Sequence, residues 1–184
     1  TIKSISLHNI KTTGNATTGT ALTAQDAIDT YTVTFETAKE LGDNGDSPTE
    51  LTSSSSNALL LIPQTGGTAW NGNTAISTND GEGGAKGSYI AVELTAQNKT
   101  NDDYVVGSKS GDAVTYATVY FPLTPDWTAG KCHSYKLHFG DKTGDTDGVG
   151  KKGDGTKETI NATAITLTAT VTDWSNGASS TIDF

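Results

Sequence analysis

The chain has 184 residues, a hydrophobic share of 33% and a formal net charge of −9, and all of its basic residues are lysines. A chain of this length is expected to bury a sizeable core as one domain over residues 1–184. The acidic balance argues against nucleic-acid binding, because phosphate contacts need clustered Lys and Arg. No apolar run is long enough to cross a membrane as a helix, so we expect no membrane span.

The chain as a whole is rich in Thr, which favours strands, and in Gly, which breaks helices. Residues 2–11 are predicted to form a strand with Ile5 and Leu7 on one face. Residues 30–38 show the clearest alternation, which predicts a half-buried antiparallel strand. Its inward side chains would be Tyr31, Val33 and Phe35, and its outward ones Thr32, Thr34 and Glu36.

The middle of the chain combines an apolar run with a long polar loop. Residues 59–62 are four apolar residues in succession, which predicts a strand covered on both faces. Residues 64–87 form the loop, and Trp70 stands in it. We interpret Trp70 either as a plug over one end of the core or as an exposed ligand platform for a sugar ring. A strand is expected next, over residues 88–96, before a polar stretch at 97–112.

Residues 114–139 are predicted to be the central hairpin, two strands joined by a short turn. The inward side chains of the two strands would be Val119, Phe121, Leu123, Tyr135, Leu137 and Phe139. Pro125 and Gly130 suit the turn. Trp127, between them, is expected to fold back over the open end of the core.

The last part of the chain begins with an acidic, glycine-rich loop at residues 140–157. An imperfect calcium-loop spacing is present there, but no helices flank it and two lysines interrupt it, so a solvated hairpin tip is preferred. The spacing comprises Thr143, Asp145, Asp147, Gly148 and Asp154. Residues 159–174 are predicted to form the longest strand, and residues 178–184 a short tail.

Residues that carry catalysis or bind metals form no recognisable motif in this sequence. His133 and His138 are five apart in one predicted strand, so they point to opposite faces and do not chelate one metal. Cys132 is the only cysteine, which rules out an intrachain disulfide and suggests an inert thiol. No nucleophile triad, phosphate loop or dinucleotide fingerprint is visible. We therefore expect no enzyme, no cofactor and no metal.

Strand signals recur about seven times without any long helix, which predicts an all-β fold, an antiparallel β-sandwich with long polar loops. Three segments in this order resemble the fimbrillin family, the pilus subunits of Bacteroides-type bacteria. They are ALLLIPQ at residues 58–64, the FPL, Trp, AGK and YKLHFG pattern within 121–140, and ITLTATVTDW at 165–174. The chain is similar to the C-terminal domain of such a two-domain pilin, with a transthyretin-like, Greek-key topology.

The resemblance implies a structural subunit or tip adhesin of an extracellular fimbrium attached to the outer membrane, made as a lipoprotein precursor. Its partners would be other pilin subunits, and it would assemble by β-strand donation. The candidate donor is the tail at residues 178–184, with Ile182 and Phe184 as anchors. The alternatives are a tail that pairs within its own sheet, and a secreted module that binds a glycan or a host protein.

Overall fold

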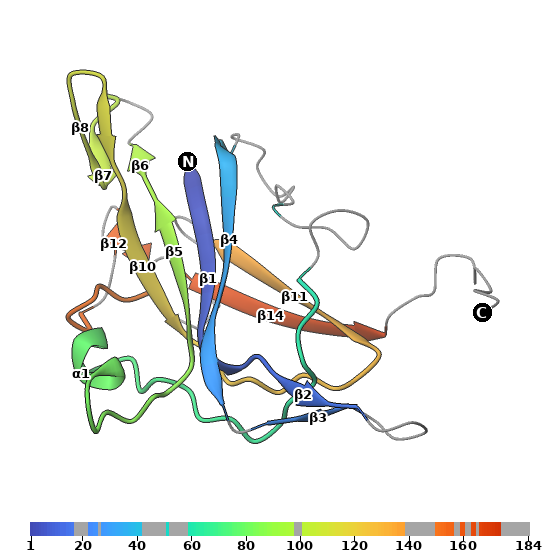
Figure 1. The fold of residues 1–184 in the computed structure, drawn as a ribbon. Coiled ribbons are helices and arrows are strands. Elements are labelled where there is room, and N and C mark those ends of the chain that lie inside the picture. The colour runs from blue at the N-terminus through green and yellow to red at the C-terminus, as the bar shows by residue number, and fades with distance from the viewer. Residues whose placement is uncertain are drawn as a thin grey trace, which may run out of the picture.

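The computed structural model describes residues 1–16, 22–25, 27–41, 51, 59–97, 101–138, 150–156, 159–160, 163–164 and 166–173. The fold is all-β, as the sequence predicts, and the pairings between the described strands are antiparallel (Figure 1). The helix in the described part, α1, is a single short segment, Ile76–Asp80.

The main sheet has four strands in the order β10-β5-β1-β4. Their bounds are Ile2–Lys11 for β1, Ile28–Lys39 for β4, Tyr89–Leu94 for β5 and Ala117–Pro122 for β10. The predictions for residues 2–11, 30–38 and 88–96 are therefore confirmed as strands. Since β5 and β1 lie inside the sheet, each is hydrogen-bonded on both sides.

A second, two-stranded ribbon joins β11, Lys131–His138, to β14, Thr166–Asp173. The predicted central hairpin is therefore wrong, because β10 pairs with β5 whereas β11 pairs with β14. The segment between them is longer than the roughly two to five residues of a tight hairpin. Its backbone bonds elsewhere, since the N–H of Trp127 donates to the carbonyl of Gln64 at 2.7 Å.

The remaining strands form separate two-stranded pairs. The short strands are β2, Gly14–Asn15; β3, Thr23–Ala24; β6, Ala96–Gln97; β7, Tyr104–Val106; β8, Ser108–Ser110; β9, Ala113–Thr115; β12, Thr159–Ile160; and β13, Thr163–Ala164. The predicted polar stretch at 97–112 contains parts of two hairpins, and the described residues of the predicted strand at 159–174 lie in strands β12, β13 and β14.

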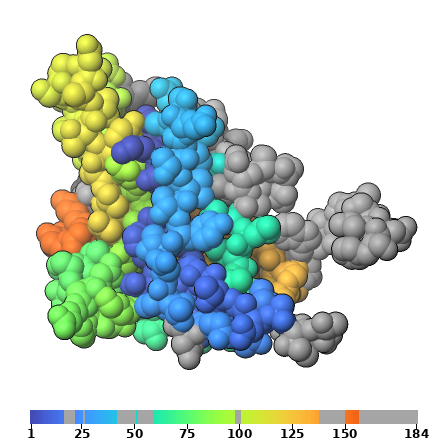
Figure 2. Space-filling model, viewed as in Figure 1, coloured from blue at the N-terminus to red at the C-terminus, as the bar shows by residue number. Residues whose placement is uncertain are grey.

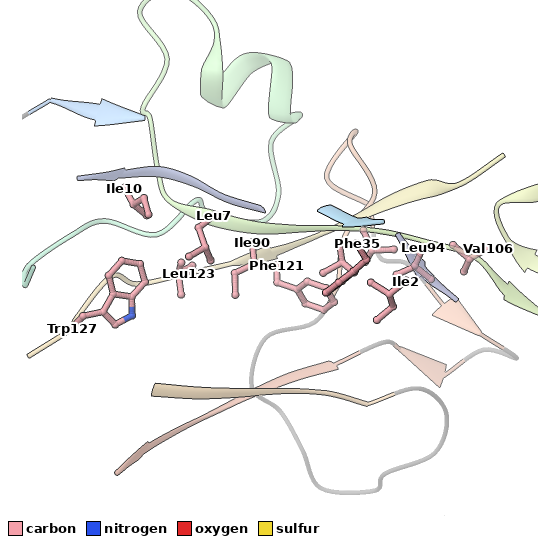
Figure 3. Close-up of a cluster of buried hydrophobic side chains, with 12 residues drawn as sticks. Ile2, Leu7, Ile10, Phe35, Ile90, Leu94, Val106, Phe121, Leu123 and Trp127 are labelled. Atoms are coloured by element: carbon pink, nitrogen blue, oxygen red, sulfur yellow. The ribbon is translucent and has the colours of Figure 1, made fainter. Parts of the chain in front are cut away.

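The main core lies on one face of the four-stranded sheet, and the β11–β14 ribbon lies on the far side of the core (Figure 3). The buried residues of the main core are Ile2, Leu7, Ile10, Phe35, Ile90, Val92, Leu94, Val106, Val119, Phe121, Leu123 and Trp127. Tyr135 and Leu137 of β11 pack against it, as their alternation predicts. A seven-stranded Greek-key sandwich stays a prediction.

Trp127 covers one end of this core, as the sequence predicts (Figure 3). Its side chain is 4% exposed, and its indole N–H donates to the hydroxyl of Tyr135 at 2.9 Å. A buried indole needs such a partner for its one donor. The bond ties the segment after β10 to β11, and so links the two sheets.

The strand predicted at residues 59–62 is absent. These residues are irregular, and Leu60 is 78% exposed, while Leu59 and Leu61 pack against the core. The backbone around them is anchored by the side chain of Gln64, which accepts from the N–H of Lys11 at 2.9 Å and donates to its carbonyl at 3.0 Å. The apolar run is thus held beside the end of β1 without entering a sheet.

A second apolar cluster covers part of the opposite, outward face of the main sheet. It consists of Trp70, Tyr89 and Ala91, with Ile76 and Tyr120 packed against them. Trp70 is 2% exposed, and its indole N–H donates to the carbonyl of Thr74 at 3.1 Å. The loop at residues 64–87 therefore carries Trp70 onto the sheet. The interpretation of Trp70 as an exposed ligand platform is wrong, and so is its placement over an end of the main core.

Candidate functional site

Strand β4 is the first candidate surface, because it is an edge strand of 12 residues. Over the described residues it pairs with β1 alone. Its residues 28–32 are all exposed, and Phe35 is its one buried residue. Unpaired N–H and C=O groups along such an edge can template another strand. Figure 2 shows β4 in light blue running along the surface of the molecule.

Three large apolar side chains are exposed around the first half of β4, and we name them the edge patch. They are Ile28, 43% exposed, Tyr31, 39% exposed, and Leu60, 78% exposed. Tyr31 and Leu60 line a small cleft of about 50 Å³, together with Ile10, Lys11, Thr12, Leu61 and Ile62. Ile28 is paired with Lys11 at the same end of β4, but it is three residues from Tyr31 and so points to the opposite face of the sheet.

Tyr31 shows where the predicted inward face of β4 ends. Phe35 is buried and Val33 packs against the core, as their alternation predicts. Tyr31 belongs to the same alternating set but stays exposed beside the cleft. Alternation determines the face of the sheet to which a side chain points. The side chain is buried only where another layer covers that face.

The second candidate surface is a pocket of about 270 Å³ on the outward face, which we name the outer pocket. The pairing register arranges its lining in cross-strand rows. One row is Ser6, Ala91 and Tyr120; the next is Ser4, Glu93 and Thr118; and His8 and Tyr89 form the third, with Ile76 of α1 beside them. Residues facing one another across a ladder lie about 4.5–5.5 Å apart at Cβ, so each row is compact.

Glu93 is the carboxylate of the outer pocket. One of its oxygens accepts from the ammonium of Lys3 at 2.8 Å, and the other accepts from the hydroxyl of Ser4 at 3.0 Å. The hydrogen bond from Lys3 is the main reason that the pKa of Glu93 is lowered. Glu93 therefore stays ionised at neutral pH, with both oxygens oriented.

His8 is the imidazole of the outer pocket. Its Nε2 lies 2.8 Å from the hydroxyl oxygen of Ser6, its Nδ1 lies 3.1 Å from that of Thr30, and its ring stacks on Tyr89 at 4.5 Å. Burial lowers the pKa of His8, and the charge of Asp80 only partly opposes this. The imidazole is therefore neutral at neutral pH and accepts one hydrogen bond.

Asp80 at the end of α1 supports this wall of the pocket. It accepts hydrogen bonds from the amides of Asn9 and Asn79, each at 2.8 Å, and from the hydroxyl of Tyr89 at 2.5 Å. Partial burial alone would raise the pKa of Asp80, but these three bonds lower it. Asn9 reaches Asp80 from an irregularity in β1, where its φ is 56°, a conformation that Asn tolerates.

The Ser6–His8 pair has the spacing of a nucleophile and its base, but its surroundings differ from those of a catalytic triad. Thr30, rather than a carboxylate, contacts the second nitrogen of His8. The nearest acidic partner, Asp80, is bonded to Tyr89 instead. The geometry therefore favours a binding surface, with His8 as a hydrogen-bonding wall.

Several residues singled out in the sequence are not among those assigned to either surface. Ile182, Phe184 and most of the calcium-like spacing fall outside the described residues. Asp154 is described, and it accepts from the N–H and hydroxyl of Thr156 at 2.8 and 2.6 Å. Among the described residues, no group of three His, Cys, Asp or Glu side chains could hold a metal ion.

Sequence reasoning missed the outer pocket. Its polar members occupy outward positions of β1, β5 and β10, to which we assigned no role from the sequence. The alternation of Ser4, Ser6 and His8 along β1 was the available signal. It could not show which residues of β5 and β10 face them, because pairing register is a tertiary property.

Comparison with known proteins gives no relative: no family model, no curated protein and no solved structure matches the chain. In the part of the chain that the structure describes, no helix is both long and apolar enough to span a membrane.

Proposed function

We propose that the chain is a structural subunit or tip adhesin of a bacterial cell-surface fimbrium, and that it assembles by accepting a strand from a neighbouring copy along β4. The edge patch carries this proposal. It places exposed Ile28, Tyr31 and Leu60 beside a long strand that pairs on one side over the described residues. Apolar side chains gathered in one place on a surface mark interaction sites.

The two edges of the main sheet differ in a way that supports the choice of β4. At the other edge, Tyr120 of β10 exchanges backbone hydrogen bonds with Lys151 at 2.8 and 2.7 Å. The side chain of Phe121 next to it is fully buried. Strand addition needs a free row of backbone groups, and β10 is already bonded at this point.

The occupant that we propose is the segment at residues 178–184, ASSTIDF, of a second copy. Ile182 and Phe184 are two residues apart, so in an extended strand both point to the same side, about 6.6–6.8 Å apart. Added along β4, the segment would gain backbone hydrogen bonds, and its two anchors would cover Tyr31 and Leu60, which line the same cleft. The resemblance to fimbrillins supports the same mode of assembly, with an extracellular location and other subunits as partners.

Removal of residues 178–184 from the chain tests the donor. We expect the shortened chain to keep its circular dichroism spectrum and unfolding midpoint but to lose self-association in sedimentation velocity. The peptide ASSTIDF, supplied separately, should then bind the shortened chain, and a peptide with Asp in place of Ile182 and Phe184 should not. Loss of folding on truncation would show instead that the segment belongs to its own subunit.

Charge introduced into the edge patch tests the acceptor. The variants Tyr31→Glu and Leu60→Glu should remain folded and fail to bind the peptide, because a carboxylate would be desolvated by the added strand. Val114→Glu is the matched control, since Val114 is also 39% exposed but lies in β9. Equal loss of binding in all three variants would contradict a specific site at β4.

A further inference from the structure

We propose that the outer pocket binds one neutral pyranose ring, as a free monosaccharide or as one residue of a glycan. The inference is independent of the proposed assembly, because the pocket opens on the outward face of the main sheet and the edge patch lies at β4. It also replaces the platform predicted at Trp70 with a different set of residues.

The hollow exists because Ala91 stands in the middle of the outward face. Along β5, Tyr89 precedes it and Glu93 follows it on the same side, and both are much larger. In its own cross-strand row, Ala91 lies between Ser6 and Tyr120. A volume of about 270 Å³ accommodates one sugar ring and does not require movement of the sheet.

The polar groups around this hollow suit a ligand with many hydroxyls. Among the described residues, the hydroxyls of Thr118 and Tyr120, which both line the pocket, have no hydrogen-bond partner. Each oxygen of Glu93 has one protein donor and can accept another hydrogen bond. A pyranose presents neighbouring hydroxyls that donate and accept at once, which matches this mixture of groups.

The aromatic wall gives the pocket an apolar side for the C–H face of a sugar. Tyr120 makes edge contacts with Trp70 and Tyr89, with ring centroids 6.4 and 5.8 Å apart. Tyr89 is itself fixed by its stack on His8 and its hydrogen bond to Asp80. Trp70 is thus a buried support for Tyr120, and the wall is rigid before any ligand arrives.

The charges of the pocket favour a neutral ligand over an anionic one. Lys3 contacts Glu93 and is already paired with it. Asp80 carries a further negative charge and is hydrogen-bonded to Tyr89 of the pocket wall. The chain as a whole has a net charge of −9. A carboxylated or phosphorylated sugar would therefore meet like charge, whereas a neutral ring would meet no charge repulsion.

The test is an amide NMR titration of the full chain with methyl glycosides of galactose, glucose, mannose and N-acetylglucosamine, with N-acetylneuraminic acid as the anionic comparison. For one ring in an open pocket, we expect a Kd of about 1 mM. At least one neutral glycoside should shift the amides of Ser6, Ala91 and Thr118, and the acid should not. No shifts with any neutral glycoside, or equal shifts with the acid, would overturn the inference.

Three variants locate the binding. Ala91→Leu fills the hollow and should abolish the shifts, and Thr118→Val removes one free hydroxyl and should weaken binding by about tenfold. Thr128→Val, in the segment between β10 and β11, is the matched control and should bind as the original chain does, because Thr128 is exposed and does not line the pocket. If Ala91→Leu does not fold, Thr118→Val decides by itself, and unchanged binding in Thr118→Val would overturn the site.

The edge-patch variant Tyr31→Glu separates this inference from the proposed assembly. It should bind the glycoside with unchanged affinity while it fails to bind the ASSTIDF peptide. Loss of glycoside binding in Tyr31→Glu would show that the sugar contacts the edge rather than the outer pocket, and would contradict the inference.

Discussion

Strands β5 and β4 belong to one sheet but differ in how much of each strand is buried. Five of the six residues of β5 are buried, because the main core covers one face and the cluster around Trp70 covers the other. Of the 12 residues of β4, only Phe35 is buried. The longer of the two strands is therefore the less covered, and the burial of a strand is set by what packs on it.

This difference also separates two kinds of exposed surface. Over β5 and β10, the loop at residues 64–87 closes part of the face and leaves a bounded pocket. Over the first half of β4, apolar side chains stay exposed beside a shallow cleft. A bounded polar pocket suits a small ligand, and an open apolar edge suits a polypeptide.

The largest loss of stability is expected from a substitution in the main core, which covers β5. Phe121→Ala removes a fully buried ring from the main core. We expect the free energy of unfolding to fall by about 3–5 kcal/mol, since the change leaves a cavity as well as losing apolar contact. Urea unfolding followed by tryptophan fluorescence measures it. A loss below about 1 kcal/mol would mean that this core is not tightly packed.

A smaller effect is expected where the loop at residues 64–87 approaches the sheet. A Cβ added at Gly87 would lie 2.6 Å from the backbone of Trp70, so Gly87→Ala must push the loop outward. We expect a loss of about 1–3 kcal/mol in urea unfolding. Gly153→Ala is the control, because its Cβ would meet only the Tyr120 ring at an ordinary 3.5 Å. Equal losses would remove the evidence for a tight loop.

Acid should destabilise the wall of the outer pocket through His8. Burial lowers the pKa of His8 below its ordinary value of 6.5, so between these two values the unfolded chain binds more protons than the folded chain. Stability is therefore highest above pH 6.5 and falls as the pH drops toward the folded pKa. Thermal melting between neutral and mildly acidic pH measures this fall.

His8→Gln should make the decline with pH shallower, whatever its effect on stability at neutral pH. The pKa of His133 is also lowered by burial. Because His133 is present in both proteins, it contributes equally to the pH dependence of each. A slope unchanged by the substitution would show that His8 titrates alike in the folded and unfolded chains.

The smallest effect is expected at the uncovered edge. Tyr31→Thr replaces an exposed side chain with another good strand former, so the free energy of unfolding should change by no more than about 0.5 kcal/mol. Urea unfolding of the monomer measures it. A loss comparable with that of Phe121→Ala would mean that β4 is covered in solution, and would break the contrast with β5.

Local patterns predicted the strands well and their partners poorly. Alternation placed Val119, Phe121 and Leu123 on one buried face, and the size of Trp127 placed it over the core. The same reasoning joined β10 to β11, because nothing in the segment between them reveals that its backbone bonds to Gln64. Two strands joined as a hairpin and two strands that belong to different sheets show the same alternation of apolar and polar residues. The pattern therefore cannot tell the two connections apart.

The candidate sites were harder to predict than the fold. Trp70 was recognisable as important, but its burial depends on a loop that returns to the outward face of the sheet. The outer pocket needs Ser6, Ala91 and Tyr120 in one row, and these residues are far apart in the sequence. The candidate donor anchors, Ile182 and Phe184, remain predictions from the sequence.

The sequence by itself determined that the chain forms strands, and which side chains of each strand share a face. This follows from the two-residue period of the extended backbone and from β-branched composition, which are local properties. Tertiary structure decided which faces are covered, which edge stays open and which side chains meet in the outer pocket. Those outcomes depend on register and layer packing, because both are fixed by contacts between segments distant in the chain.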